Sequence, residues 1–198
     1  MNWLEFEEKY AHHGLVCGVD ESGAGPLAGP VFAAAVILPA DVLIEGVNDS
    51  KKLTAKRRRD AYPRIIEAAI AYSITSVDND DIDEINILQA RLKAMRLAVE
   101  GLNPPSDFAL IDGLYVPQMA TPCVAIEKGD ARSQSIAAAS ILAKVARDEL
   151  MMQMHEIYPQ YSFNTNKGYG TPAHIAALRE HGACSIHRRS FIGGIVRV

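Results

Sequence analysis

Hydrophobic residues occur along this chain in two patterns, as short continuous runs and as longer stretches with helical spacing. A short, partly β-branched run bounded by glycine, proline or acidic residues predicts a buried strand. The first two runs flank a glycine-rich turn and therefore predict a β-hairpin. Runs of this kind occupy residues 15–19, 31–38, 71–77, 108–111 and 123–126.

The longer stretches predict helices. Residues 81–102 place apolar side chains on one stripe, and Asn103-Pro104-Pro105 ends the pattern. Residues 133–158 predict a second long helix, rich in small residues that allow close packing on a sheet. A third begins at Thr171-Pro172 and ends at Gly182. Strands alternating with helices indicate an α/β fold. The stripe of the first helix consists of Ile82, Ile85, Leu88, Leu92, Met95 and Val99.

Composition limits the class of protein. A chain of 198 residues with 48% hydrophobic content can bury one full core, which favours a single domain. The acidic N-terminus lacks the pattern of a signal peptide, and no apolar run is long enough to span a bilayer. Three scattered cysteines form no CxxC pair and are typical of reduced thiols. These features together predict a cytoplasmic protein.

Acidic residues follow three of the predicted strands. Asp20 and Glu21 come after the first run, Asp112 after the run at 108–111, and Asp130 soon after the run at 123–126. Each acid alone has an even chance of being a surface residue or a turn cap. Four carboxylates meeting at one edge of a sheet would repel each other unless cations neutralised them. Because oxygen ligands suit hard cations, the pattern predicts a Mg²⁺ or Mn²⁺ site for phosphoryl transfer rather than a zinc site.

Several longer strings carry a resemblance to a known family. In order along the chain, and covering nearly all of it from Leu15 onward, the sequence resembles bacterial type 2 ribonucleases H (ribonuclease HII). The resemblance implies a ribonuclease H-like fold, with a central mixed sheet flanked by helices in a single domain. It also implies a catalytic core at about 14–160 and a helical C-terminal segment at about 161–198, covering one side of the substrate groove. The strings are GVDESGAGPLAGPV, NDSKKL, LIDG, KGD, AASILAKVARD, NKGYGT and HRRSF.

The resemblance also implies an activity. The protein would be an endonuclease that cuts the RNA strand of RNA–DNA hybrids and the 5′ side of ribonucleotides embedded in duplex DNA. A two-metal-ion mechanism would leave a 3′-hydroxyl and a 5′-phosphate. Asp20, Glu21 and Asp112 would bind the divalent cation, Mn²⁺ or Mg²⁺, and Asp130 would complete the catalytic set. A monomer is the family expectation.

Substrate-binding residues are implied in the same way. The Gly23-Ala24-Gly25 turn lets bare backbone approach a ribose 2′-hydroxyl, although the family usually has arginine where this chain has Ala24. Tyr169 would pack on the nucleotide at the RNA-to-DNA junction. The alternative for this tyrosine is a buried residue that holds its loop in place. Lys167, Lys51 and Lys52 are candidate phosphate contacts.

The net charge of −4 has the wrong sign for a nonspecific nucleic-acid binder, so the argument depends on local basic clusters. Each cluster alone is more often a solvated surface than a phosphate track. The run from Lys56 to Arg59 is interpreted as helix surface, and Lys144 with Asp148 as a structural ion pair. The clusters are Lys51-Lys52, Lys56 to Arg59, Lys128, Arg132 and Arg188-Arg189.

Three alternatives stay open at this point. Type 3 ribonucleases H share the Asp-Glu-Ser-Gly opening but carry an extra N-terminal domain, for which the residues before Leu15 leave no room. A catalytically inactive nucleic-acid-binding module would gain nothing from buried acids beside phosphates. A Mg²⁺-dependent phosphatase acting on small molecules would need neither a 2′-hydroxyl sensor nor a stacking tyrosine.

Overall fold

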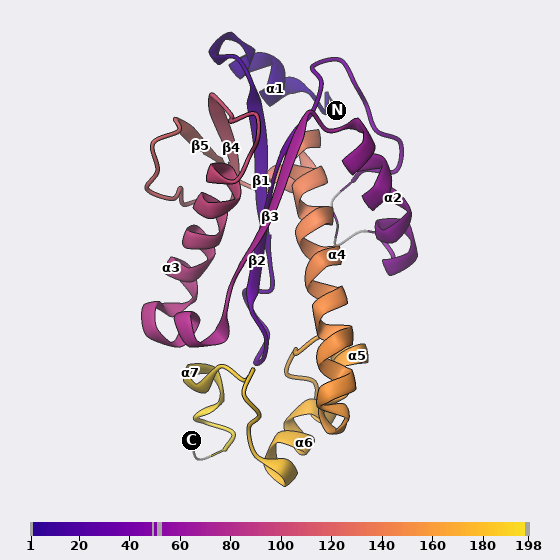
Figure 1. The fold of residues 1–198 in the computed structure, drawn as a ribbon, viewed down its shortest axis with the longest axis vertical. Helices are drawn as coiled ribbons and strands as arrows, with labels where there is room; N and C mark the ends of the chain where they lie inside the picture. The colour runs from indigo at the N-terminus through magenta and orange to yellow at the C-terminus, as the bar shows by residue number, and fades with distance from the viewer. Residues whose placement is uncertain (1, 49, 51–52, 197–198) are drawn as a thin grey trace.

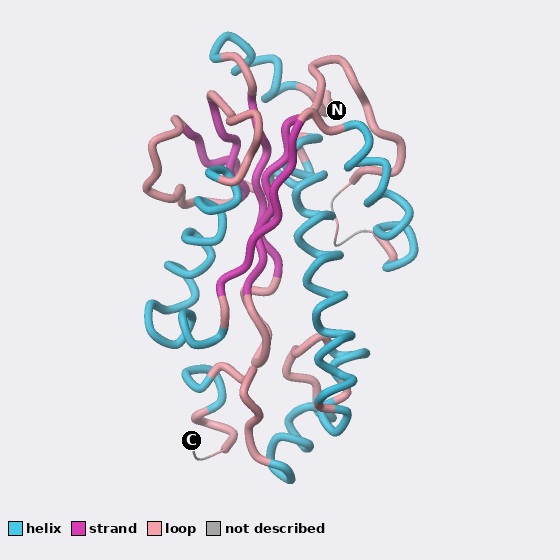
Figure 2. Tube along the Cα trace, viewed as in Figure 1, coloured by secondary structure: helices cyan, strands magenta, loops and turns pink. Residues whose placement is uncertain are grey.

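A computed structural model describes residues 2–48, 50 and 53–196. Helices flank a twisted sheet, and the chain ends in short helices gathered at one end of the molecule (Figures 1 and 2). The strands are β1 Val16–Ser22, β2 Val31–Ile37, β3 Ala71–Val77, β4 Phe108–Asp112 and β5 Cys123–Ile126. The helices are α1 Glu5–Tyr10, α2 Ala55–Ala68, α3 Asn79–Glu100, α4 Gln134–Ile157, α5 Phe163–Asn166, α6 Pro172–His181 and α7 Arg189–Ile192, with short 3-10 helices at Ala11–His13, Gly129–Ala131 and Pro159–Tyr161.

The sheet is mixed, with strand order β3-β2-β1-β4-β5. β2 pairs antiparallel with both β1 and β3, whereas β4 is parallel to β1 and to β5. Helix α3 covers one face, and α4 with α2 covers the other (Figure 1). This architecture confirms the predicted ribonuclease H-like fold and the predicted hairpin of β1 and β2.

Alternate residues of the central strands point into two different cores. Cys17 and Val19 pack in the core under α3, whereas Ala34 and Val36 pack against α4 and α2. A Cβ atom on Gly18 would lie 2.2 Å from the backbone nitrogen of Ile136, so α4 rests directly on β1. Because side chains alternate along a strand, this packing puts residue 20 on the α4 face and residue 21 on the α3 face.

Two predicted elements, the first strand and the first long helix, have different bounds in the structure. The first strand does not stop at Val19 but continues to Ser22, because Asp20, Glu21 and Ser22 pair with β2 at Ala34, Ala33 and Phe32. Helix α3 starts earlier than predicted, at Asn79, because the Asp78 side chain accepts a hydrogen bond from the Asp81 nitrogen.

The single apolar stripe predicted for this helix is interrupted. Asn86 has φ 65°, and its side-chain oxygen accepts hydrogen bonds from the nitrogens of Leu88 and Gln89, so it caps a second helical stretch. The break changes the face that the following residues present to the sheet. Ile82, Met95 and Val99 are buried as predicted, but Ala90, Ala94 and Ala98 replace Leu88 and Leu92 as the fully buried positions.

The predicted helices at residues 133–158 and 171–182 are confirmed as α4, capped by Ser133, and α6, capped by Thr171. Short helices α5, α6 and α7 lie beyond the end of the sheet, with α5 and α6 near the last turns of α4 and α7 on the side of α3 (Figure 1). Lys56, Arg57 and Arg59 are exposed on α2, as predicted. The surface interpretation of Arg188-Arg189 was wrong for Arg188, which is fully buried while Arg189 is exposed. No helix in the described part of the chain is long and apolar enough to cross a membrane.

Candidate active site

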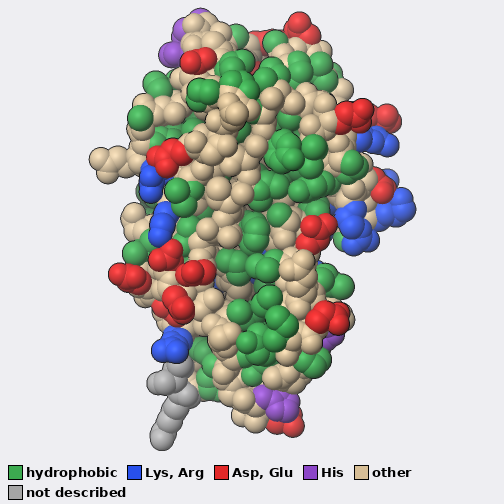
Figure 3. All heavy atoms as spheres, viewed as in Figure 1, with side chains coloured by type: hydrophobic (Ala, Val, Ile, Leu, Met, Phe, Trp, Pro, Cys, Tyr) green, Lys and Arg blue, Asp and Glu red, His purple; other side chains and the backbone are tan. Residues whose placement is uncertain are grey.

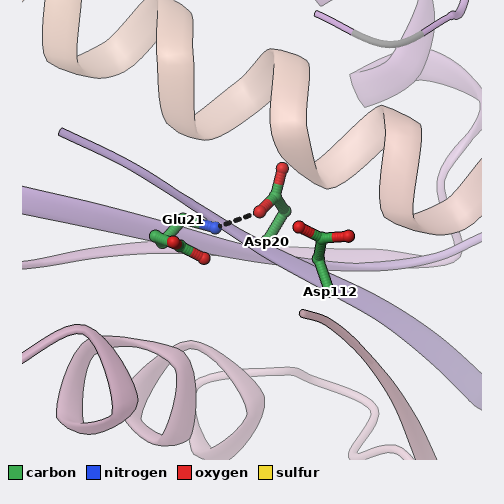
Figure 4. A group of neighbouring side chains, drawn as sticks. All are labelled: Asp20, Glu21 and Asp112. Carbon is green, nitrogen blue, oxygen red and sulfur yellow. Dashed lines mark hydrogen bonds between the residues drawn. The ribbon is translucent and has the colours of Figure 1, made fainter. Parts of the chain in front are cut away.

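Three carboxylates come together where β1 and β4 run side by side. The parallel register pairs Val19 with Ile111, so the next residues along the two strands are Asp20 and Asp112. Oxygen atoms of Asp20, Glu21 and Asp112 all lie within 4.8 Å of one another. Figure 4 shows Asp20 and Asp112 on the side of α4, with Glu21 on the opposite side of the strand. Because β4 ends at Asp112, the Glu21 side chain can approach the other two past the strand end.

The loop after β5 fixes the orientation of Asp112. Its Oδ1 atom accepts hydrogen bonds from the backbone nitrogens of Gly129, at 2.6 Å, and Asp130, at 3.3 Å. Asp130 is buried behind this contact and is not part of the group of three. Its charge nevertheless contributes to the raised pKa of Asp20. The structure thus places the fourth predicted acid beside the cluster rather than within it.

Glu21 has a cationic partner on α3. Its Oε1 lies 3.2 Å from a guanidinium nitrogen of Arg91 on α3. Its Oε2 is buried and has no hydrogen-bond partner among the described residues. The Glu21 backbone nitrogen donates a hydrogen bond to Oδ1 of Asp20 at 2.7 Å (Figure 4).

Burial and mutual repulsion disfavour the charged forms of this cluster. Burial, followed by the charges of Glu21, Asp112 and Asp130, raises the pKa of Asp20 well above its usual value. Burial also raises the pKa of Glu21, although Arg91 opposes the shift. Crowded carboxylates with an unpartnered buried oxygen suit a hard divalent cation, which prefers oxygen ligands and would relieve the repulsion. The residues present therefore fit the predicted metal.

A cavity of about 180 Å³ opens beside the carboxylates. It brings together the acids, the glycine turn and the tyrosine that lie far apart in the sequence. Two cationic side chains, Arg58 from α2 and Lys144 from α4, reach the same space. Figure 3 shows that Lys and Arg side chains gather at the edge of the molecule formed by α2. The lining residues are Asp20, Glu21, Ser22, Gly23, Ala24, Ser50, Arg58, Asp112, Lys144 and Tyr169.

Both cations are held by neighbouring polar groups. Lys144 donates a hydrogen bond to Asp148 at 2.6 Å, which confirms the predicted ion pair. Arg58 donates to the backbone oxygens of Ser50 and Leu53 and lies 3.9 Å from Asp148. The charge on this side of the cavity is therefore positioned before any ligand binds.

The glycine turn lies next to Tyr169. A Cβ atom on Gly25 would lie 3.9 Å from the Tyr169 ring. The tyrosine side chain is 43% exposed, which does not fit the alternative of a buried loop residue. The Lys144 ammonium and the Arg147 guanidinium lie 6.0 and 5.9 Å from the ring centroid.

Lys167, one of the predicted lysine contacts, does not line this cavity. Lys167 turns back on its own loop, where its amine donates to the Asn164 backbone oxygen and contacts the Met152 sulfur. It lines a neighbouring cavity together with Arg58, Arg59 and Asp148. Lys51 and Lys52 lie outside the described residues.

Sequence reasoning assigned no role at the site to four arginines that surround it: Arg58 and Arg188 were named only within basic clusters, and Arg91 and Arg147 were not singled out. Arg91 and Arg58 contact the cluster and the cavity, while Arg147 and Arg188 are fully buried under the glycine turn. Arg147 does leave a signal in the sequence: it follows Ser140 by seven positions, on the stripe of small residues that α4 turns toward the sheet. No sequence signal distinguishes Arg188 from its exposed neighbour.

Comparison with known proteins identifies the family. The ribonuclease HII family model matches residues 17–193. The chain belongs to the ribonuclease HII family. It is 50% identical over 198 residues to ribonuclease HII of Caldicellulosiruptor saccharolyticus, covering 99% of this chain and 97% of that protein. It is 54% identical over 177 residues to ribonuclease HII of Idiomarina loihiensis, covering 89% and 95%. The crystal structure of ribonuclease H2 from Pyrococcus horikoshii OT3 superposes with TM-score 0.74 at 25% identity, covering 88% and 92% of the two chains.

Membership of this family resolves part of what the sequence left open. The family consists of metal-dependent endonucleases, so the chain is an enzyme of that class with ribonuclease H activity on RNA–DNA hybrids. The matching family is type 2 rather than type 3. Such an enzyme uses divalent cations, and the carboxylate cluster is a group of residues that could hold one.

Proposed function

We propose that this protein cuts the RNA strand of RNA–DNA hybrids and the 5′ side of single ribonucleotides in duplex DNA, leaving a 3′-hydroxyl and a 5′-phosphate. One observation carries the proposal. Three carboxylates with oxygens within 4.8 Å line the same cavity as Gly23 and Ala24 of the glycine turn and an exposed tyrosine, Tyr169. Cleavage chemistry and a surface suited to reading a ribose therefore lie in one space.

The acids have separable tasks in this proposal. Asp20, Glu21 and Asp112 hold the divalent cation, Mn²⁺ or Mg²⁺, and Asp130 completes the catalytic set. Two such cations, when bound, supply Lewis-acid activation of water and charge stabilisation at the scissile phosphate. The backbone nitrogens of Gly129 and Asp130 keep Asp112 oriented toward the cavity, and Arg91 keeps Glu21 in place. Lys144 and Arg58 supply positive charge in the same cavity, where it would attract a phosphate.

Selection of RNA over DNA depends on the turn and the tyrosine. A 2′-hydroxyl both donates and accepts hydrogen bonds, and only a bare backbone can approach the sugar closely. The Gly23-Ala24-Gly25 turn offers that backbone, and the Tyr169 ring offers a flat surface for the adjoining nucleotide. Ala24 has no guanidinium, so Arg58 and Lys144 are the cations closest to this role among the described lining residues.

The remaining parts of the proposal concern the surroundings of the site. Lys51, Lys52 and Lys167 contact the phosphate backbone outside the cavity, and the helical segment from about residue 161 covers one side of the substrate groove. The enzyme acts as a monomer in the cytoplasm. The nucleic acid is its partner, and the basic edge formed by α2 gives it a surface of the appropriate sign (Figure 3).

The test is cleavage of a DNA duplex that carries one internal ribonucleotide, with Mg²⁺, with Mn²⁺ and with EDTA. The expected result is a cut on the 5′ side of the ribonucleotide that EDTA abolishes. Asp20→Asn purified in parallel controls for contaminating nucleases, and an all-DNA duplex controls for the 2′-hydroxyl requirement. Cleavage of a continuous hybrid without cleavage at the single ribonucleotide would reject junction recognition. Hydrolysis of small phosphate esters in place of both would favour a phosphatase.

A further inference from the structure

Two arginines are buried beneath the glycine turn without an acidic partner. Arg147 on α4 and Arg188, just before α7, are both 0% exposed. Among the described residues, neither forms an ion pair with a carboxylate within 4.0 Å. A buried guanidinium is costly unless its donors are satisfied, so the partners of these side chains reveal what they do.

Arg188 binds both ends of the Gly23–Gly29 segment, which contains the turn proposed to contact the ribose. Its guanidinium nitrogens donate to the backbone oxygens of Gly23 at 2.6 Å, Ala24 at 2.9 Å and Gly29 at 2.9 Å. Three charge-assisted hydrogen bonds from one planar group leave the turn little freedom. The backbone nitrogen of Arg188 also donates to the oxygen of Leu27.

Arg147 joins the same turn to the loop of Tyr169. It donates to the backbone oxygens of Ala28 and Pro30, both at 3.1 Å, and to that of Lys167 at 3.0 Å. It also explains why residue 23 is glycine, because a Cβ atom there would lie 2.1 Å from Nε of Arg147. The Arg147 guanidinium therefore connects the segment after the glycine turn to the loop that carries Tyr169.

The peptide geometry gives these contacts a consequence for recognition. The C=O and N–H groups of a trans peptide point in opposite directions. Because the oxygens of Gly23 and Ala24 point down to Arg188, the N–H groups of Ala24 and Gly25 point away from it, and Ala24 lines the cavity. The positive charge beneath the turn also polarises these peptides, which strengthens the outward N–H groups as donors.

A chain of hydrogen bonds supports Tyr169 from the other side. The Cys184 backbone N–H donates to Nδ1 of His187, whose Nε2 lies 3.0 Å from Nε2 of His174. Nδ1 of His174 lies 2.9 Å from the backbone oxygen of Tyr169. Because the Cys184 donor makes Nδ1 of His187 an acceptor, one direction satisfies the chain: His187 donates to His174, and His174 donates to Tyr169. The C-terminal segment thus contacts both the glycine turn, through Arg188, and Tyr169, through His174.

We infer that Arg147 and Arg188 are positioning residues that set the preference for a ribose over a deoxyribose, by fixing the Gly23–Gly25 amides against Tyr169. This inference rests on the proposed function, because it deepens the role of the same turn. Neither arginine reaches the carboxylates, so the metal site does not depend on them. Loosening either one therefore affects recognition of the sugar and leaves metal binding intact.

The test compares Arg188→Lys with Arg189→Lys. Lysine keeps the charge but cannot reach three divergent oxygens, whereas Arg189 is an exposed neighbour and receives the same substitution. Arg188→Lys is expected to lower kcat/KM for the single-ribonucleotide duplex by about tenfold or more, since small misplacements of positioning groups are costly. In EDTA, where cleavage is off, its Kd ratio between the ribonucleotide duplex and all-DNA duplex is expected to move toward unity. Mn²⁺ affinity, measured by calorimetry, is expected to match wild type.

A second pair of variants separates positioning from general destabilisation. Met154→Ala reduces packing in the same C-terminal core without touching the arginine or histidine contacts, and it is expected to keep the wild-type Kd ratio. Arg147→Lys loosens the turn from the α4 side and is expected to lower the ratio as Arg188→Lys does. Wild-type discrimination in both lysine variants would overturn the inference. If wild type itself ignores the single ribonucleotide, the proposed function fails instead.

Discussion

Two clusters of buried charge lie on either side of the glycine turn, and their charges are balanced in opposite ways. The acidic cluster on β1 and β4 gathers carboxylates of like charge, of which Glu21 pairs with Arg91, and a buried oxygen of Glu21 has no hydrogen-bond partner among the described residues. The basic cluster under the turn directs two guanidiniums onto six backbone oxygens. The first needs a ligand to balance it, whereas the second is balanced by the fold.

The difference separates reactivity from structure. A site that must bind cations and phosphates keeps unbalanced charge, and it costs stability until the ligand arrives. A site that must immobilise the glycine turn has its hydrogen-bond donors and acceptors matched within the protein. Removing a charge is therefore expected to have opposite effects on stability in the two clusters.

The largest expected effect is the loss of catalysis in Asp112→Asn. The amide oxygen can still accept from Gly129 and Asp130, so the fold is retained while a metal ligand is lost. We expect kcat to fall by about 10³-fold, the size of a major electrostatic contribution to catalysis. In EDTA the Tm is expected to rise, because one repelling charge is gone. Asp107→Asn, on an exposed loop residue, is the control, and near-normal turnover by Asp112→Asn would contradict the acid cluster as the site.

Arg147→Met is expected to have the opposite effect on stability. It leaves the backbone oxygens of Ala28, Pro30 and Lys167 without their donor, which is expected to cost about 3 kcal/mol in urea unfolding. Arg189→Met changes an exposed arginine of the same chain and is expected to leave the free energy of unfolding unchanged. Equal stability of the two variants would show that the carbonyls find other partners.

Acidification is expected to weaken the histidine pair behind Tyr169. Burial, followed by the proximity of His174, lowers the pKa of His187 from 6.5 to about 4, and burial also lowers the pKa of His174. As the pH falls below 6.5, His187 becomes protonated in the unfolded chain. In the folded chain it stays neutral until about pH 4, so the free energy of unfolding decreases across that window. The loss is at most about 3 kcal/mol for His187. Urea titrations at several pH values should show that the free energy of unfolding of His187→Gln depends less on pH than that of wild type. Identical slopes would contradict a role for His187 protonation.

The two glycines of the turn are expected to differ. Gly23→Ala forces a Cβ atom into the Arg147 guanidinium at a residue with φ +97°, and is expected to cost about 1 to 3 kcal/mol. Gly25→Ala meets only ordinary contact with the Tyr169 ring and is expected to change stability by less than about 0.5 kcal/mol. Thermal melts of both variants decide the point, and a harmless Gly23→Ala would show that the arginine can move aside.

The smallest expected effect is a gain in affinity from Ala24→Arg. The added guanidinium lies beside the cavity and can contact one phosphate, so the slope of log K against log salt is expected to steepen by about one. Fluorescence anisotropy on ribonucleotide-containing duplex at several salt concentrations measures both quantities, with Ala24→Gln as the uncharged control. An unchanged slope would mean that the turn acts through its backbone alone.

Much of the fold could be predicted from local pattern. Short apolar runs predicted the strands, and helical spacing with proline and glycine stops predicted α4 and α6, because these signals act over a few residues. The extent of β1 and the break in α3 could not be predicted. The first depends on pairing with β2, and the second on a single asparagine that caps a helix from within.

The sequence by itself singled out the acids, glycines and tyrosine of the proposed site, because motif strings record residue type and order along the chain. Only the tertiary structure decided how they meet: β4 stops level with Asp20, Asp130 lies behind Asp112, and Lys167 turns away. It also decided that Arg188 is buried while Arg189 is exposed. Neighbouring arginines are equivalent in a string of letters, and only the arrangement of backbone oxygens from distant segments tells them apart.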